Sequence, residues 1–230
     1  MQPDLLRFEH MKSGLMVFIV LGGAATASAN LISDGSFENP SVPAGTFVNY
    51  VGGDTIGAWN VVGTEVSTVS STYGEPANGI PDFNAEDGSV SLDLTGPGNN
   101  GLTSGVSQSF ASTAGYGYLL KFWEGTAISD NGSPFYQADA NLQLSVNNGP
   151  EVNCPNPYST PGVVNWQYFL IGIRAKGPST NLTFTNGSLY TDYVGLDNVT
   201  VTLNSTPEPA PFAVIGLGAL GVLLRRRRRS

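Results

Sequence analysis

The sequence predicts an all-β protein, and more specifically a jelly-roll β-sandwich. Glycine, serine, threonine and asparagine punctuate residues 30–205 throughout. Between them lie short runs in which apolar and polar side chains alternate, the pattern of a strand with one buried face. In residues 89–94, for example, Val90, Leu92 and Leu94 alternate with Ser89, Ser91 and Asp93. No stretch of twelve residues shows the 3.6-residue apolar period of a helix, so the body is expected to be built from strands.

Eleven strands are expected along this body. They are residues 30–32, 46–50, 58–62, 65–70, 89–94, 105–110, 116–124, 140–147, 166–175, 182–185 and 194–203. Residues 166–175 carry apolar side chains on both faces, which predicts a central strand. The alternation in the last strand changes near Gly195, which predicts a shift of register there. Residues 71–88, 95–104, 125–138 and 148–164 are expected to be loops. Two antiparallel sheets with long crossovers would place binding sites on a concave face or in the end loops.

Residues 1–29 have the organisation of a signal peptide. Lys12 precedes an apolar run over residues 15–21, and small residues follow it. Ala27 and Ala29 fit the small-x-small pattern that signal peptidase cuts, so the mature chain would begin at Asn30. The alternative is an N-terminal anchor that is not cleaved.

Residues 206–230 combine three features in a fixed order. Pro207, Glu208 and Pro209 come first, and an uncharged apolar run over residues 210–224 follows. The chain then carries five consecutive arginines, Arg225, Arg226, Arg227, Arg228 and Arg229. As a helix the run would be about 22 Å long, which is short of a hydrocarbon core of roughly 30 Å. The sequence therefore predicts a transmembrane helix suited to transient insertion, with its basic end held in the cytoplasm.

This C-terminal arrangement resembles the PEP-CTERM sorting signal of Gram-negative bacteria. The resemblance implies recognition and processing by exosortase near the Pro-Glu-Pro motif. It also implies export, passage through the inner membrane, and delivery to the cell surface or extracellular matrix, often together with exopolysaccharide. The alternative is an ordinary C-terminal anchor with a basic stop signal.

The body between the two terminal signals is strongly acidic. Residues 30–205 contain fifteen acidic residues against three basic ones, Lys121, Arg174 and Lys176, which gives a net charge of −12. Such a surface repels nucleic acid phosphates, so a nucleic-acid partner is not expected. It also repels acidic polysaccharides unless a divalent cation bridges the two. The acidic excess is compatible with calcium, which prefers oxygen ligands.

Several separated pieces of the body match one family in order. They are the sequences NLISDGSFE, GSVSLDLTG, GVSQSF, YLLKFWEG, LQLSVN, LTFTN and GLDNVTV, together with Trp59. Together they resemble the choice-of-anchor C type of bacterial surface domain and, more broadly, galactose-binding-like jelly rolls such as carbohydrate-binding modules. The resemblance implies a structural calcium between Glu38 and Asp197. The alternative is that these two carboxylates cap turns or accept backbone hydrogen bonds.

The chemistry available to the body is limited. The single histidine, His10, precedes the expected cleavage site, and Cys154 is the single cysteine. The mature body therefore lacks Ser-His-Asp and Cys-His catalysis and histidine-bound zinc, and it cannot form an internal disulfide. Cys154 is expected in a loop, as a buried or incidental thiol. Paired carboxylates such as Asp82, Glu86 and Glu124 could still serve a glycosidase, but no catalytic function is expected.

Sugar binding needs flat aromatic surface beside planar polar groups. Trp123, Tyr136 and Tyr158 are the candidate ligand-binding residues, in or near the long loops. Further candidates are Phe135, with Asn131, Gln137 and Asn156 as polar partners. The alternative is that the tryptophans belong to the core or are half-buried.

The sequence thus predicts an exported, non-catalytic surface or matrix protein associated with exopolysaccharide or another carbohydrate. The alternatives are a secreted carbohydrate-active enzyme or its binding module, and a passive spacer without a ligand.

Overall fold

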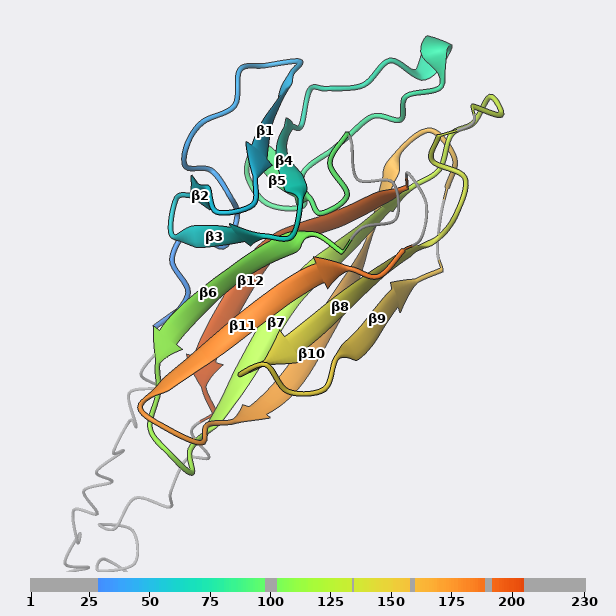
Figure 1. Ribbon diagram of the computed structural model, residues 1–230. Helices are drawn as coiled ribbons and strands as arrows, with labels where there is room; N and C mark the ends of the chain where they lie inside the picture. Colours follow the sequence, from blue (N-terminus) through green and yellow to red (C-terminus); the bar gives the residue numbers. More distant parts are fainter. Residues whose placement is uncertain (1–28, 98–102, 134, 158–159, 189–191, 205–230) are drawn as a thin grey trace, which may run out of the picture.

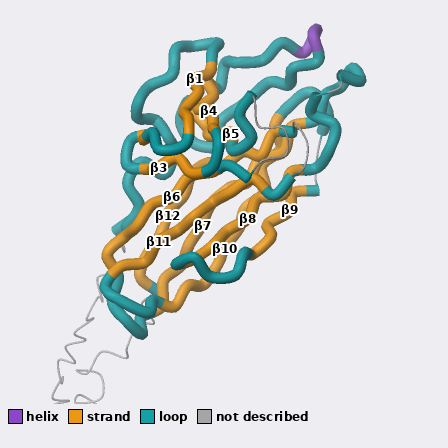
Figure 2. Tube along the Cα trace, viewed as in Figure 1, coloured by secondary structure: helices purple, strands orange, loops and turns teal. Residues whose placement is uncertain are grey.

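The computed structural model describes residues 29–97, 103–133, 135–157, 160–188 and 192–204 of the chain (Figure 1). Two six-stranded antiparallel sheets pack face to face, and the only helix in the described part is the short 3₁₀ turn η1, Pro76–Asn78 (Figure 2). The prediction of an all-β jelly-roll sandwich is confirmed. The expected signal peptide and sorting segment lie outside the described residues, apart from Ala29. Within the described ranges, no helix is long and apolar enough to cross a bilayer.

We name the two sheets A and B. Sheet A has the strand order β1 (Phe47–Val51), β4 (Glu65–Ser70), β5 (Val90–Asp93), β12 (Tyr193–Leu203), β7 (Gly117–Ala127) and β10 (Val164–Arg174). Sheet B has the order β2 (Thr55–Ile56), β3 (Trp59–Val62), β6 (Gly105–Ala111), β11 (Ser179–Asn186), β8 (Ala140–Val146) and β9 (Val152–Asn156). Apart from the consecutive pairs β2–β3, β4–β5 and β8–β9, neighbours in each sheet are not consecutive in the chain, so most of the strand order is fixed by long-range pairing.

The main core fills the space between the sheets, as the alternation of the strands requires. On β7 the side chains of Tyr118, Leu120 and Phe122 are buried, as predicted. Trp59 is fully buried, and its indole N–H donates to the carbonyl oxygen of Asp34 at 2.8 Å. The ring of Trp59 also packs against Phe184, with ring centroids 6.0 Å apart. A buried indole with a satisfied N–H stabilises the core without the cost of an unpaired donor.

A second, smaller apolar cluster covers the outer face of sheet A. We call it the outer cluster; its buried members are Val69, Phe83, Ala127, Val164 and Tyr193. Tyr73, Ile80, Tyr136 and Trp166 pack against it from the loops and from β10. Val69 and Tyr193 belong to this cluster, whereas Val66 and Val194 belong to the main core. β4 and β12 therefore bury both of their faces, one between the sheets and one under the loops.

Strand β10 was expected to be central, but it lies at the edge of sheet A. Its inner side chain Phe169 stacks on Phe122, with centroids 5.2 Å apart. Its outer side chains Tyr168 and Leu170 are 40% and 55% exposed. The apolar residues on its outer face are therefore surface residues, which the sequence pattern alone cannot distinguish from buried ones.

Other expectations about the strands need correction. Residues 152–156 were expected in a loop, but they form edge strand β9, which tolerates Pro155 because its outer side needs no donor. Cys154 is thus buried in a strand. Residues 30–32 form no strand, although the Leu31 N–H donates to the Val201 carbonyl at 2.8 Å. The register shift of the last strand falls between Asp197 and Thr200, where Asn198 has a φ of 49°, rather than at Gly195.

Candidate functional site

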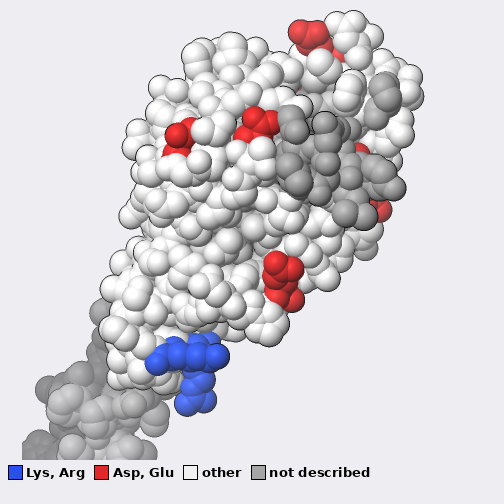
Figure 3. Space-filling view, in the orientation of Figure 1, with Lys and Arg blue, Asp and Glu red and all other residues white. Residues whose placement is uncertain are grey.

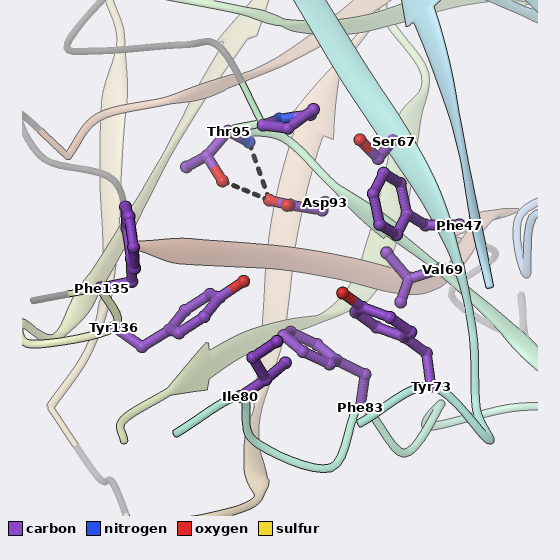
Figure 4. Close-up of a pocket in the computed structure, with 12 residues that line it drawn as sticks. Phe47, Ser67, Val69, Tyr73, Ile80, Phe83, Asp93, Thr95, Phe135 and Tyr136 are labelled. Atoms are coloured by element: carbon purple, nitrogen blue, oxygen red, sulfur yellow. Dashed lines mark hydrogen bonds between the residues drawn. The ribbon is translucent and has the colours of Figure 1, made fainter. Parts of the chain in front are cut away.

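A pocket of about 240 Å³ opens on the outer face of sheet A, above the outer cluster (Figure 4). Its floor is made by Ser67 and Val69 of β4 and by Asp93 at the end of β5. Three loops and strand β1 supply the walls, and the described lining there consists of Phe47, Tyr73, Ile80, Phe83, Thr95, Gly96, Pro97, Phe135 and Tyr136. The site therefore combines chain segments that range from Phe47 to Tyr136 in the sequence.

Asp93 is the charged group of the described lining. Its Oδ1 accepts hydrogen bonds from the Thr95 backbone N–H at 2.9 Å and from the Thr95 hydroxyl at 2.5 Å. Burial raises the pKa of Asp93 to about 6, and these hydrogen bonds oppose the rise. Asp93 lies on the outer face of β5 because Val90 and Leu92 face the main core. The pocket thus has a fixed, half-buried carboxyl group at its floor.

Two tyrosine hydroxyls point into the pocket from opposite loops, as Figure 4 shows for Tyr73 and Tyr136. Burial raises the pKa of Tyr136, and the nearby Asp93 and Tyr73 raise it further. The pKa of Tyr73 is also raised, by burial and by the charge of Glu75. Below them Tyr193 is fully buried, with its hydroxyl 3.0 Å from that of Ser91. Both pocket tyrosines therefore stay neutral and can donate or accept hydrogen bonds.

The walls are aromatic and partly exposed. Phe47 packs edge-on against Tyr73 with centroids 5.3 Å apart, and Tyr73 stacks on Phe83 at 5.6 Å. Phe83 in turn contacts Tyr136 at 5.7 Å. Phe47 and Phe135 are 39% and 54% exposed at the pocket, which leaves ring surface free to contact a ligand. Such a set of rings around a few polar groups is the usual composition of a small-molecule site.

The wall that carries Tyr136 is held from below by Asp192. One oxygen of this buried carboxylate accepts the backbone N–H of Gln137 at 2.9 Å and that of Ala138 at 3.1 Å. Tyr136 itself has a φ of 58°, and its carbonyl accepts the N–H of Ser129 at 2.9 Å. The position of Tyr136 is thus set by the backbone of its own loop and by Asp192, which precedes β12.

The predicted ligand-binding residues do not come together. Tyr136 lines the pocket, whereas Trp123 lies outside its lining, on the outer face of β7, where it packs on Tyr168 with centroids 5.2 Å apart. Tyr158 lies outside the described residues. The amides of Asn131, Gln137 and Asn156 bond within the loops or to neighbouring backbone, as in the Asn156 hydrogen bonds to the carbonyls of Glu124 and Asn165. As the sequence suggested, Trp59 is a core residue, and Trp123 and Trp166 are half-buried.

Sequence reasoning missed Asp93, Phe47 and Tyr73 as site residues. Asp93 had been placed correctly on the polar face of its strand. The sequence Asp93-Leu94-Thr95, in which a carboxylate can accept the N–H two residues on, was the signal for a fixed side chain there. Nothing local to Phe47 or Tyr73 indicates that they meet over β4.

Glu38 and Asp197 both bind the turn at residues 86–90. Oε1 of Glu38 accepts the N–H groups of Ser89 at 2.7 Å and Val90 at 2.9 Å, and Oε2 accepts the Ser89 hydroxyl at 2.7 Å. Oδ2 of Asp197 accepts the N–H groups of Glu86 at 2.8 Å and Asp87 at 3.1 Å. Its Oδ1 accepts the N–H of Asn198 at 2.7 Å.

These contacts correspond to the alternative interpretation of the pair, in which both carboxylates hold a turn. Burial raises the pKa of Asp197 to about 8, and the acidic neighbour that adds to this shift is Glu86 rather than Glu38. Calcium requires six to eight oxygen ligands, whereas N–H donors surround these oxygens. In the described part of the chain, no three His, Cys, Asp or Glu side chains are grouped so as to hold a metal ion. As arranged, Glu38 and Asp197 do not fit a calcium site.

The other carboxylates considered for catalysis, Asp82, Glu86 and Glu124, are not part of the described pocket lining. Glu86 accepts a hydrogen bond from the Asn198 amide at 2.8 Å, beside the turn. Glu124 lies in the interior of β7 and is fully buried between the sheets. The described pocket lining therefore presents one carboxyl group rather than a facing pair.

Comparison with known proteins identifies the C-terminal segment. The model of the PEP-CTERM protein-sorting motif matches residues 205–229. A sorting motif of this kind implies an exported protein that is processed by exosortase and held only transiently in the membrane. The chain matches no curated protein.

Several solved structures are similar to the body in fold. TmCBM61 in complex with β-1,4-galactotriose has a TM-score of 0.45 and 17% identity, and the match covers 77% of this chain and all of that one. The CBM22-1 xylan-binding domain of Paenibacillus barcinonensis Xyn10C has a TM-score of 0.38 and 16% identity, with 71% and 97% covered. The GH26-CBM35 β-(1,4)-mannanase of Podospora anserina has a TM-score of 0.41 and 14% identity, with 72% and 29% covered. What each of these proteins binds or cleaves is a property of that protein.

Proposed function

We propose that this protein is an exported, non-catalytic carbohydrate-binding protein of the bacterial surface or extracellular matrix. The observation that carries the proposal is the aromatic pocket on the outer face of sheet A, with Asp93 and two tyrosine hydroxyls directed into it. A sugar ring has apolar C–H faces and polar edges. Aromatic walls suit its faces, while a carboxylate and hydroxyl groups suit its edges.

The proposed destination follows from the two ends of the chain. Signal peptidase would cut after Ala29, and exosortase would process the chain near Pro207, Glu208 and Pro209. The mature protein would then reach the surface or matrix of a Gram-negative bacterium, where exopolysaccharide would be the carbohydrate available for binding. The sorting motif at residues 205–229 supports this route.

The absence of catalysis is also part of the proposal. Hydrolysis of a glycosidic bond usually needs two carboxyl groups on either side of the bond. Asp93 is the carboxyl group of the described lining, and it is already bonded to Thr95. The alternative, a secreted carbohydrate-active enzyme or its binding module, predicts turnover of the bound glycan.

The first test compares Tyr136→Ala with Trp123→Ala in binding to a glycan array and to the exopolysaccharide of the producing cells. Tyr136 forms part of the pocket wall, whereas Trp123 lies on the same sheet outside it, so Trp123→Ala is a matched control for loss of an aromatic surface residue. We expect Tyr136→Ala to weaken binding about tenfold or more, since stacking and a lost hydrogen bond are each worth about 1 kcal/mol.

Three outcomes would decide between the functions. Loss of binding in Tyr136→Ala with retention in Trp123→Ala supports the pocket. The reverse result would place the site on the Trp123–Tyr168 surface. Release of reducing sugar from a bound glycan by the unaltered protein would support the enzyme and reject a binding protein.

A further inference from the structure

We propose that the pocket selects a sugar unit that carries a free amino group, as in a de-N-acetylated hexosamine. This inference rests on the proposed carbohydrate-binding function and names the class of sugar. It follows from the one charge at the floor of the pocket, from the rings around it, and from the distribution of charge over the body.

The floor of the pocket carries a negative charge, and the described lining holds no cationic partner for it. Asp93 receives hydrogen bonds from Thr95, and the backbone N–H groups of Gly96 and Val194 also favour its charged form. These dipoles stabilise the carboxylate but leave its charge uncompensated. Coulomb attraction between this carboxylate and a ligand ammonium would be stronger in the half-buried pocket than in water.

The walls are also suited to a cation. The described rings around Asp93 belong to Phe47, Tyr73, Phe83, Phe135 and Tyr136. The face of an aromatic ring carries partial negative charge and attracts an ammonium group, and this attraction increases when the site is partly desolvated. Rings that would merely stack on a neutral sugar therefore add to the attraction for an amino sugar.

None of the three basic residues of the body belongs to the described lining of the pocket. Arg174 pairs with Gly117 at the start of β7, whereas the pocket and the outer cluster lie near its end at Ala127. Lys121 lies four residues before Gly125 on β7, and Gly125 is level with Asp93 through Gly195 of β12. Figure 3 shows the opposite face of the molecule, that of sheet B, where the basic atoms lie in the lower part. A uronic acid would meet Asp93 and a body of net charge −12 with no cation on the described lining to pair with it. This charge distribution disfavours acidic sugars and favours basic ones.

The test uses the full-length protein in detergent micelles and isothermal titration with matched sugars. Gluco-, galacto- and manno-configured sugars are each supplied in three forms: the neutral hexose, the 2-amino-2-deoxy sugar and its N-acetyl derivative. We expect at least one amino sugar to bind about tenfold more tightly than both of its uncharged counterparts, because a hydrogen bond between charged groups is roughly twice as strong as a neutral one.

Asp93→Asn tests the origin of the preference. The amide keeps an oxygen that can accept from Thr95 but removes the charge, so we expect the three forms of the sugar to bind with similar affinity. Glu151→Gln removes one charge from the exposed turn between β8 and β9 and should leave the preference unchanged. A circular dichroism melt of each variant confirms that it is folded.

The outcomes separate this inference from the function on which it rests. Equal binding of neutral and amino sugars by the unaltered protein would overturn the amino-sugar preference and retain carbohydrate binding. Failure of every sugar to bind would overturn both. A preference for the amino sugar that persists in Asp93→Asn would also overturn the inference. So would equally tight binding of lysine with its α-amino and carboxyl groups blocked, because the pocket would then recognise an amine rather than an amino sugar.

Discussion

Glu124 is a carboxyl group inside the main core. It lies on the buried face of β7, in line with Phe122. By distance and angle no hydrogen bond reaches its carboxyl oxygens in the described part of the chain, because the nearby Asn156 amide donates to the carbonyl oxygens of Glu124 and Asn165 instead. Burial raises the pKa of Glu124 to about 9; the neighbouring Asn156 opposes the rise and the charge of Asp139 adds to it. Glu124 is therefore protonated at neutral pH, because an ionised carboxylate in this position would lack compensating contacts.

This protonation makes the stability of the fold depend on pH. The folded-state pKa of about 9 lies above the ordinary value of 4.5, so the folded protein holds a proton that the unfolded chain releases. The stability that Glu124 contributes is complete below about pH 4.5 and is lost progressively as the pH rises towards 9. The loss is roughly 1.4 kcal/mol per pH unit within this window.

Glu124→Gln removes the titrating group and keeps the shape of the side chain. We expect the free energy of unfolding of the variant to fall less between pH 5 and about pH 8 than that of the unaltered protein. Urea denaturation at several pH values within this range measures, for each protein, how steeply the free energy of unfolding changes with pH. Equal slopes would show that Glu124 is ionised, or paired, in the folded protein.

At the scale of elements, the turn at residues 86–90 connects distant strands. Glu38, near the start of the described chain, and Asp197 of β12 both accept hydrogen bonds from its backbone. Gly88 within it has a φ of 73°, and a Cβ added there would collide with the Glu38 carboxylate. The turn therefore requires glycine for two reasons, its left-handed backbone and the close approach of Glu38.

Gly88→Ala should destabilise the protein more than Gly115→Ala. Gly115 has a similar φ of 85°, but a Cβ added there meets no atom within 4 Å. We expect Gly115→Ala to lower the free energy of unfolding by about 1 kcal/mol, the penalty for a left-handed backbone at a residue with a Cβ. Gly88→Ala should cost about 2 kcal/mol or more, since the Glu38 hydrogen bonds are displaced as well. Urea unfolding of both variants checks the difference, and equal costs would mean that Glu38 does not depend on this contact.

The same turn bears on the calcium prediction. Its carboxylates are occupied by N–H and O–H donors, so we expect the melting temperature of the protein to be the same in calcium chloride and in a chelator. The opposite result would be a melting temperature that rises when calcium is added to the unaltered protein but not when it is added to Glu38→Gln. That result would support the metal site that the family resemblance implied.

At the scale of the whole molecule, the pocket lies away from the end of the sandwich where the described chain begins and ends. β12 runs from Tyr193, under the outer cluster, to Leu203, a distance of about 35 Å for eleven extended residues. The Asn30 side chain accepts the N–H of Val201, which places the start of the described body beside the end of β12 (Figure 1). A body attached through its C-terminus would therefore present the pocket away from the attachment point.

Processing at both ends is the prediction at this scale. We expect mass spectrometry of protein recovered from cells and medium to find a chain that begins at Asn30 and ends near Pro207, Glu208 and Pro209. Replacing these three residues with alanine should leave the C-terminal segment in place, because the apolar run and the arginines remain while the recognised motif is lost. An intact 230-residue chain in the cytosol would contradict both signals.

The sequence by itself determined the fold class and the faces of most strands. Val90, Leu92 and Leu94 had to face the core, because side chains alternate along a strand and apolar ones avoid water. The sorting motif could likewise be identified from the sequence, since its three parts are contiguous in the chain. Such features depend on near neighbours, and for these a local pattern is sufficient.

Only the tertiary structure decided the order of the strands and the composition of the pocket. Asp93 meets Tyr73 and Tyr136 because β4 pairs with β5 and because Asp192, a residue far along the chain, holds the loop of Tyr136. The edge position of β10 and the separation of Trp123 from Tyr136 have the same origin. Pairing between distant strands leaves no local trace in the alternation of side chains, so the sequence singled out Tyr136, which lines the pocket, but not the other residues that line it.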